Sequence, residues 1–293
     1  MPSRLTHILA ASVALFLAAP AAFAQDSKPS TIAATAEAHA KAVVSIKMSL
    51  KYEGSFGEHE QEREVTGVII DASGLILCSN SQSGGVPPSM QDRMSGVTVT
   101  PRDIKVTVEN NEDALDAKLI ARDSELDLAW IKVSELKGMT LTSIDLAAAA
   151  TPALADEMVG VGRLSKYFDH APMLTFCRVS ALAKKPRNLI IPSDMNDLGI
   201  PVFTNSGKLV GVTIVQLPEV DEDNDEDMRS QLRGLGASMV ILPAADVAAA
   251  TKHALETADA DAPTPADKQA DKPADAPTPA DKPADPAIDS TEE

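Results

Sequence analysis

The sequence predicts an all-β protein, and three observations support this class. Between about residues 40 and 250, short apolar runs rich in β-branched residues alternate with turn-forming residues. Two of the turns, at residues 71–74 and 204–207, stand between paired runs and end in a glycine that can adopt positive φ. Helical patterns occur only at the two flanks of this region. Eleven strands at this spacing are typical of β-barrels and β-sandwiches.

The expected elements follow one another along the chain. A helical pattern at residues 31–41 precedes the first strand. A second helical pattern, at residues 243–255, starts with a proline followed by alanine-rich sequence, as helix starts often do. Between them, β-branched and apolar residues predict strands at 43–46, 65–70, 75–77, 104–108, 117–121, 128–133, 158–161, 179–182, 188–191, 209–215 and 239–242.

The N-terminus has the layout of a secretory signal. Arg4 precedes an apolar run, and Ala22-Phe23-Ala24 precedes Gln25 as a small-residue cleavage site. The apolar run is shorter than the roughly 20 residues that a membrane-spanning helix needs. We therefore expect cleavage and a periplasmic or secreted protein, with no membrane span, rather than a membrane anchor.

The C-terminal residues differ in composition from the rest of the chain. Residues 256–293 consist mostly of Ala, Pro, Asp, Lys and Thr, and the heptapeptide APTPADK occurs twice. Such a segment has too little apolar surface to offset the entropy lost on ordering, which predicts a disordered acidic tail. The expected organisation is a signal peptide at 1–24, an N-terminal segment at 25–39, a folded domain at 40–255 and the tail at 256–293.

The net charge of −17 is concentrated in two places. Residues 254–293 contribute −8, and residues 219–227 contribute −7. The rest of the folded domain is only mildly acidic, which disfavours a nucleic-acid partner. The seven acidic residues of the second group, which we call the acidic cluster, are Glu219, Asp221, Glu222, Asp223, Asp225, Glu226 and Asp227.

The acidic cluster resembles the start of an EF-hand loop only superficially. An EF-hand needs a glycine at the sixth position and a bidentate acid at the twelfth, but Glu226 and Leu232 stand there. We therefore expect no specific metal site and no cofactor. Weak nonspecific cation binding stays open.

The chain has two cysteines, Cys78 and Cys177. An oxidising compartment would permit them to form a disulfide. Both also lie in apolar, strand-like surroundings, where a cysteine commonly acts as a small buried hydrophobic residue. The sequence leaves both interpretations open.

Six blocks of sequence occur in a characteristic order. They are VTGVIIDASGLILCSNS at 65–81, the block at 104–132 that ends in DLAWIK, DEMVGVG at 156–162 with VSAL at 179–182, NDLGIP at 196–201, GKLVGV at 207–212 and ILP at 241–243. In order and spacing they resemble the protease domain of the DegP-like, high-temperature-requirement branch of trypsin-like serine proteases. The resemblance implies a trypsin-like double antiparallel β-barrel with a short N-terminal helix and a C-terminal helix. We expect no PDZ domain after residue 255.

The resemblance also implies that two of the three catalytic groups are substituted. Asp127 stands at the aspartate position of the catalytic triad, Ser81 at the histidine position and Leu198 at the serine position. Without an imidazole, no group with a pKa near 7 takes the proton from a hydroxyl, and a leucine cannot attack a carbonyl. Either substitution alone removes the mechanism.

The turn that would form the oxyanion hole is altered as well. Asn196, Asp197 and Leu198 occupy its positions, with Asn196 in place of the first glycine and Ile200 in place of the last. Asparagine tolerates positive φ better than most residues, so the turn can keep its shape.

Four histidines of the mature chain could in principle replace the missing base: His39, His59, His170 and His253. Only His170 falls in a segment that the resemblance places near the substrate cleft. We expect it to be an exposed loop residue.

These observations favour an exported, catalytically inactive homologue that binds a peptide or protein partner. The resemblance places the acidic cluster in a loop beside the substrate pocket, where it would favour a basic peptide. Two alternatives stay open: an active serine-type endopeptidase with a non-standard catalytic group, and a structural envelope protein that acts through its acidic tail. The sequence gives neither the partner nor the oligomeric state.

Overall fold

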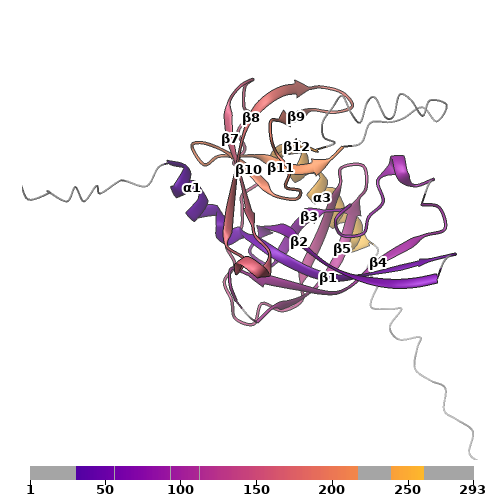
Figure 1. The fold of residues 1–293 in the computed structure, drawn as a ribbon. Coiled ribbons are helices and arrows are strands. Elements are labelled where there is room, and N and C mark those ends of the chain that lie inside the picture. The colour runs from indigo at the N-terminus through magenta and orange to yellow at the C-terminus, as the bar shows by residue number, and fades with distance from the viewer. Residues whose placement is uncertain (1–30, 56, 93, 112, 217–238, 261–293) are drawn as a thin grey trace, which may run out of the picture.

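The computed structural model describes residues 31–260, apart from residues 56, 93, 112 and 217–238. The described residues form twelve strands in two closed antiparallel barrels (Figure 1). This confirms the all-β class and the double-barrel architecture that the resemblance implied. The first barrel has the strand order β1-β2-β3-β6-β5-β4 and the second β10-β11-β12-β9-β8-β7.

The strands of the first barrel are β1 (Val43–Gly54), β2 (Gly57–Asp71), β3 (Leu75–Ser79), β4 (Thr98–Val108), β5 (Leu115–Asp123) and β6 (Leu128–Val133). Those of the second are β7 (Glu157–Arg163), β8 (Pro172–Ala183), β9 (Leu189–Pro192), β10 (Pro201–Thr204), β11 (Leu209–Val215) and β12 (Met239–Pro243). The helices are α1 (Thr31–His39) and α3 (Ala244–Ala260), with short 3₁₀ helices at Ala40–Ala42, Pro88–Met90 and Lys166–Phe168.

Both predicted hairpin turns are confirmed. Gly74 has φ +87° between β2 and β3, and Gly207 has φ +80° between β10 and β11. In each turn the glycine N–H donates a hydrogen bond to the carbonyl three residues earlier, at 3.0 Å for Gly74 and 2.9 Å for Gly207.

Three expectations about elements need correction. Strand β10 was not expected, because it has only four residues and begins with a proline, which a strand tolerates at its first position. Strands β1, β2, β4 and β8 are much longer than expected, and for β2 the reason is that residues 57–64 are exposed and carry no hydrophobic pattern. Helix α3 continues to Ala260, five residues beyond the expected end of this helix.

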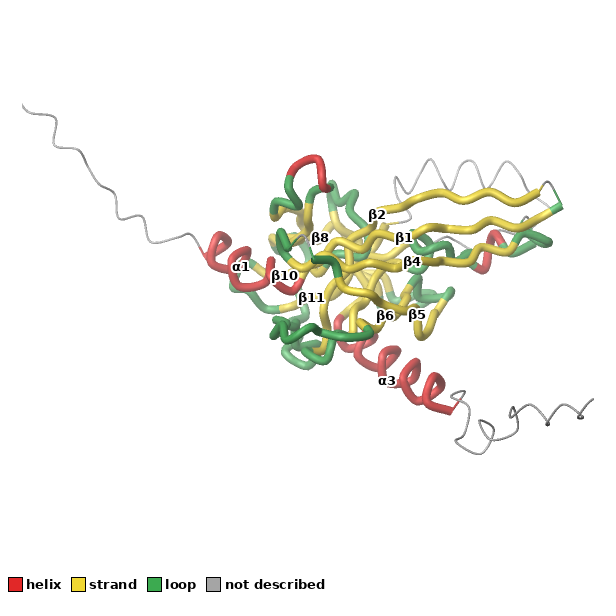
Figure 2. Tube along the Cα trace, turned by 90° about the horizontal axis from the view of Figure 1, so that it is seen from below, coloured by secondary structure: helices red, strands yellow, loops and turns green. Residues whose placement is uncertain are grey.

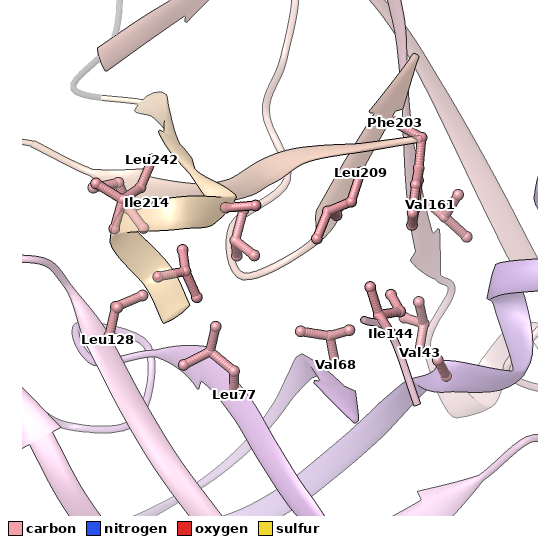
Figure 3. Close-up of a cluster of buried hydrophobic side chains, with 14 of the residues drawn as sticks. Val43, Val68, Leu77, Leu128, Ile144, Val161, Phe203, Leu209, Ile214 and Leu242 are labelled. Carbon is pink, nitrogen blue, oxygen red and sulfur yellow. The ribbon is translucent and has the colours of Figure 1, made fainter. Parts of the chain in front are cut away.

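The largest hydrophobic core lies between the two barrels. Figure 3 shows Val68, Leu77 and Leu128 of the first barrel facing Phe203 and Ile214 of the second. All of these side chains are buried. Burial of apolar area at roughly 25 cal/mol per Å² makes this shared core a main source of stability for the two-barrel arrangement.

Helix α3 connects the barrels from outside, because it contacts β5 of the first and β11 and β12 of the second. The indole N–H of Trp130, itself buried on β6, donates to Thr251 Oγ1 on the helix at 3.0 Å. Val247 and Ala254 bury the adjacent apolar face. Among the described helices, none is long and apolar enough to cross a membrane.

Candidate functional site

Asp127 is the centre of the candidate site. It lies in the turn between β5 and β6, has φ +54° and is only 4% exposed. Its Oδ1 accepts a hydrogen bond from the backbone N–H of Ser81 at 2.7 Å. Its Oδ2 accepts from the hydroxyl of Ser79 at 2.9 Å and from the N–H of Val215 at 3.0 Å. Because Val215 belongs to β11, this carboxylate links the two barrels.

Two serines surround this carboxylate. Ser79, at the end of β3, is buried, and its Oγ lies 3.0 Å from the Oγ of Ser81. The backbone N–H of Asn80 donates to the carbonyl of Asp127 at 3.0 Å. The structure therefore brings Ser81 to Asp127, as the sequence comparison placed them, and adds Ser79 as the residue whose side chain binds the carboxylate.

Arg122 holds the turn that carries these serines. Its guanidinium donates to Asn80 Oδ1 at 2.5 Å, to Ser83 Oγ at 3.2 Å and to the carbonyl of Ser83 at 2.7 Å. Burial lowers the pKa of Arg122. Sequence reasoning missed this residue. Its only sequence signal is a basic side chain that directly follows an apolar strand.

The turn at residues 196–201 meets the first barrel at Gly199. This glycine has φ +72°, and a Cβ there would lie 3.1 Å from both the N of Ser79 and the O of Thr66. Such close approach of backbones, together with positive φ, requires glycine. The turn therefore lies against the strands that carry the Asp127 network, and Leu198 is the residue directly before Gly199.

The backbone of this turn is fixed by Thr213 on β11. The N–H of Gly199 donates to the carbonyl of Thr213 at 2.9 Å, and the N–H of Ile200 donates to its hydroxyl at 3.0 Å. Thr213 and Ile200 are both buried. None of these bonds uses the side chain of Leu198, which is half-buried.

Two further residues of the turn have polar surroundings. Asp197 accepts a hydrogen bond from the hydroxyl of Thr175 at 2.7 Å, and Asn196 is exposed. Residues 196, 197 and 198 all have negative φ, whereas Asp194 and Gly199 are left-handed. The positive φ that we considered for Asn196 is therefore not used.

Each histidine in the described ranges either contacts residues other than Asp127 or lies on the surface. The ring of His39 stacks on Phe203 with centroids 4.1 Å apart, and that of His59 stacks on Tyr52 at 4.6 Å. His253 is exposed on α3.

His170 is not the exposed loop residue that we expected. Its side chain is only 13% exposed, and its Nδ1 lies 3.3 Å from Glu64 Oε1. Its carbonyl accepts a hydrogen bond from the buried Arg163 at 2.9 Å, which explains why this loop segment is held inward. Among the described residues, the donors to the Asp127 carboxylate are Ser79, Ser81 and Val215, and none of them is a histidine.

The two cysteines are free and lie in the cores of different barrels. Cys78 is buried in the first and Cys177 in the second, so the disulfide that the sequence left open is not formed. Burial raises the pKa of the Cys78 thiol to about 12 and that of Cys177 to about 11.

Other expectations fall on residues that the structure leaves undescribed. They concern the secretory signal, the acidic cluster and most of the tail. In the part of the chain that is described, no group of three or more His, Cys, Asp or Glu side chains is arranged to hold a metal ion.

Comparison with known proteins gives matches among solved structures. No protein-family model matches the chain. The curated proteins contain no match either. Among solved structures, the crystal structure of Deg5 matches with a TM-score of 0.45 and 18% sequence identity, over 62% of this chain and 82% of the Deg5 chain. The strand pairing of the described residues itself defines the class, an all-β protein of two six-stranded barrels.

Proposed function

We propose that the chain is an exported, catalytically inactive homologue of DegP-like serine proteases that binds a peptide or protein partner where the two barrels meet. The observation that supports this proposal most strongly is the set of hydrogen-bond donors around the Asp127 carboxylate. The carboxylate lies next to Ser81 and close to the turn that bears Leu198, but its hydrogen bonds come from a serine hydroxyl and two backbone N–H groups.

The chemistry of these groups supports inactivity. General-base catalysis at neutral pH needs a group with a pKa near the working pH, as an imidazole has. Serine hydroxyls at positions 79 and 81 cannot fill that role, and Leu198 has no lone pair with which to attack a carbonyl. A substrate bound here would meet a hydrogen-bonded scaffold without an acid–base pair or a nucleophile.

Retention of the scaffold supports binding. Arg122, Thr213 and Gly199 hold both sides of the junction through hydrogen bonds or close packing that needs no reacting group. The acidic cluster follows β11 in sequence, four residues after Val215, whose N–H contacts Asp127. This proximity in sequence favours a partner segment that carries positive charge.

The enzymatic half of the proposal is tested with a serine-directed fluorophosphonate probe and an unfolded protein substrate. We expect neither labelling nor cleavage, while an active trypsin-like protease assayed in parallel shows both. Stoichiometric labelling of the purified chain would end the proposal.

The binding half is tested by affinity capture from an envelope extract. Because α3 reaches Ala260, the two baits are residues 25–293 and 25–260. We expect both to retain the same partner, and Leu198→Arg to lose it. Leu182→Arg is the matched control, since Leu182 is an exposed leucine on β8. Loss of the partner with the shorter bait alone would assign binding to the tail instead.

A further inference from the structure

Strands β1, β2 and β4 continue beyond the first barrel as a three-stranded extension, which we call the arm (Figure 2). The arm comprises residues 47–54, 57–64 and 98–104. In this extension β1 is central, with β2 on one side and β4 on the other. Strand β3 pairs with β2 only from Gly67 onward, and β5 pairs with β4 only at Lys105 and Val106. The arm therefore has two outer edges without a neighbouring described strand.

The two edges differ in their capacity to pair with another strand. Strand β4 contains Pro101, which lacks an N–H, and its register with β1 shifts between Lys47 and Ser49. Strand β2 pairs with β1 without interruption from Val68 to Gly57 and has no proline. All of residues 57–64 are exposed, and among the described residues only those of β1 form backbone hydrogen bonds with them.

A regular, open strand edge is a binding surface. It presents a row of unpaired N–H and C=O groups that can pair with an extended segment of another chain. Over residues 57–64 such a row is roughly 25 Å long, at about 3.3 Å per residue.

The side chains along this edge carry negative charge on one face. Because side chains alternate along a strand, Glu58, Glu60, Glu62 and Glu64 share that face. Lys51 forms ion pairs with Glu58 and Glu53, and Lys47 with Glu62. Glu64 also accepts a hydrogen bond from Ser45 Oγ at 2.6 Å and lies 3.3 Å from His170 Nδ1. Arg102 of β4, which is paired with Ser49 and acts on Glu53, is a third cation on this face. Three cationic side chains of β1 and β4 therefore face five carboxylates, and the edge keeps a surplus of negative charge.

The negative charge along the β2 edge favours some pairing segments over others. Pairing between the β2 edges of two copies would place glutamates beside glutamates, which is destabilising. An extended segment with Lys or Arg at alternate positions would place positive charge beside the four glutamates, while its backbone pairs with the open edge.

We propose that the outer edge of β2, residues 57–64, binds an extended basic segment of a partner protein by strand addition. This site involves other residues than the Asp127 site and does not depend on the function proposed above. The occupant supplies backbone hydrogen bonds along the strand and cationic side chains at every second position.

The test uses a nine-residue peptide of alternating Lys and Thr, with capped ends and a fluorescent label, titrated with the purified full chain. We expect the triple variant Glu58→Gln, Glu60→Gln and Glu62→Gln to bind at least tenfold more weakly. The matched control replaces three exposed glutamates outside the arm, Glu125, Glu135 and Glu256, by Gln. It should bind like the unmodified chain, and equal affinity of both triple variants would overturn the proposal.

Two further measurements separate strand addition from simple charge attraction and from the other site. The same peptide N-methylated at every residue keeps its charge but loses the backbone donors of both strand edges, so we expect it to lose binding. Unchanged binding of the methylated peptide would overturn strand addition. Leu198→Arg should leave the affinity unchanged, whereas loss of binding in this variant, with the arm variant unaffected, would assign the peptide to the junction between the barrels.

Discussion

The two barrels contribute to the candidate site in different ways. The first supplies side chains: the carboxylate of Asp127 binds Ser79, and Arg122 fixes the turn at Asn80 and Ser83. The second supplies mainly backbone, through the N–H of Val215 and the tight turn at Gly199. The difference shows that the side chains at positions 81 and 198 can vary without loss of the fold. Neither set of contacts involves the side chain at position 198. The hydrogen bonds to the Asp127 carboxylate come from a serine hydroxyl and two backbone N–H groups, so they need no histidine.

The largest effect is expected in the first barrel, from Asp127→Ala. The change leaves the Ser79 hydroxyl and two backbone N–H groups without their acceptor in a buried site. At about 1–3 kcal/mol for each unsatisfied group, we expect a loss of at least about 3 kcal/mol in the free energy of unfolding. Urea denaturation followed by circular dichroism measures it. A loss below about 1 kcal/mol would contradict a structural role for this carboxylate.

A smaller effect is expected in the second barrel, from Gly199→Ala. The new Cβ would meet the backbones of Ser79 and Thr66 at 3.1 Å in a left-handed conformation. We expect about 2–3 kcal/mol of destabilisation, since backbone strain alone costs about 1 kcal/mol or more. Gly138→Ala is the matched control, because Gly138 has φ +80° but nothing within 4 Å of its added Cβ. Equal losses in the two variants would show that contact between the barrels at Gly199 is not tight.

Arg122→Met tests the hydrogen bonds by which Arg122 holds the turn at Asn80 and Ser83 in the first barrel. The methionine keeps much of the buried apolar stem but leaves Asn80 Oδ1 and the carbonyl of Ser83 without their donor. We expect a loss of about 2 kcal/mol in thermal or urea unfolding. The control Arg178→Met removes an exposed ion pair with Glu157 and should cost about 0.5 kcal/mol or less. A larger loss of stability for Arg178→Met than for Arg122→Met would mean that the hydrogen bonds of Arg122 do not stabilise the fold.

Sequence reasoning recovered the parts of the fold that leave a local pattern. Strands buried on one or both faces, such as β3 and β6, and the glycine turns at 74 and 207 were predicted correctly, because burial and positive φ constrain residue type. The outer half of β2 was missed, since a strand exposed on both faces needs no hydrophobic residues.

The site was predictable in position but not in its contacts. The block comparison placed Asp127, Ser81 and the turn with Leu198, and the structure brings these segments together. The hydroxyl of Ser79 and the guanidinium of Arg122 were missed, because their partners lie 48 and about 40 residues away and are set by tertiary packing. The catalytic roles assigned to these positions stay predictions.

The smallest effect on stability is expected from Leu198→Ser, which introduces a hydroxyl at the turn. Leu198 is half-buried and its side chain takes no part in the hydrogen bonds of the turn, so we expect a loss of about 1 kcal/mol or less. The variant should still neither label with a fluorophosphonate nor cleave unfolded protein, since position 81 offers no base. The matched comparison is the double variant Ser81→His with Leu198→Ser. It places an imidazole next to the Asp127 carboxylate, and its labelling by the fluorophosphonate is compared with that of the single variant. Labelling of the single variant would show that a base other than residue 81 serves this turn, and would contradict the proposal that Ser81 accounts for part of the expected inactivity.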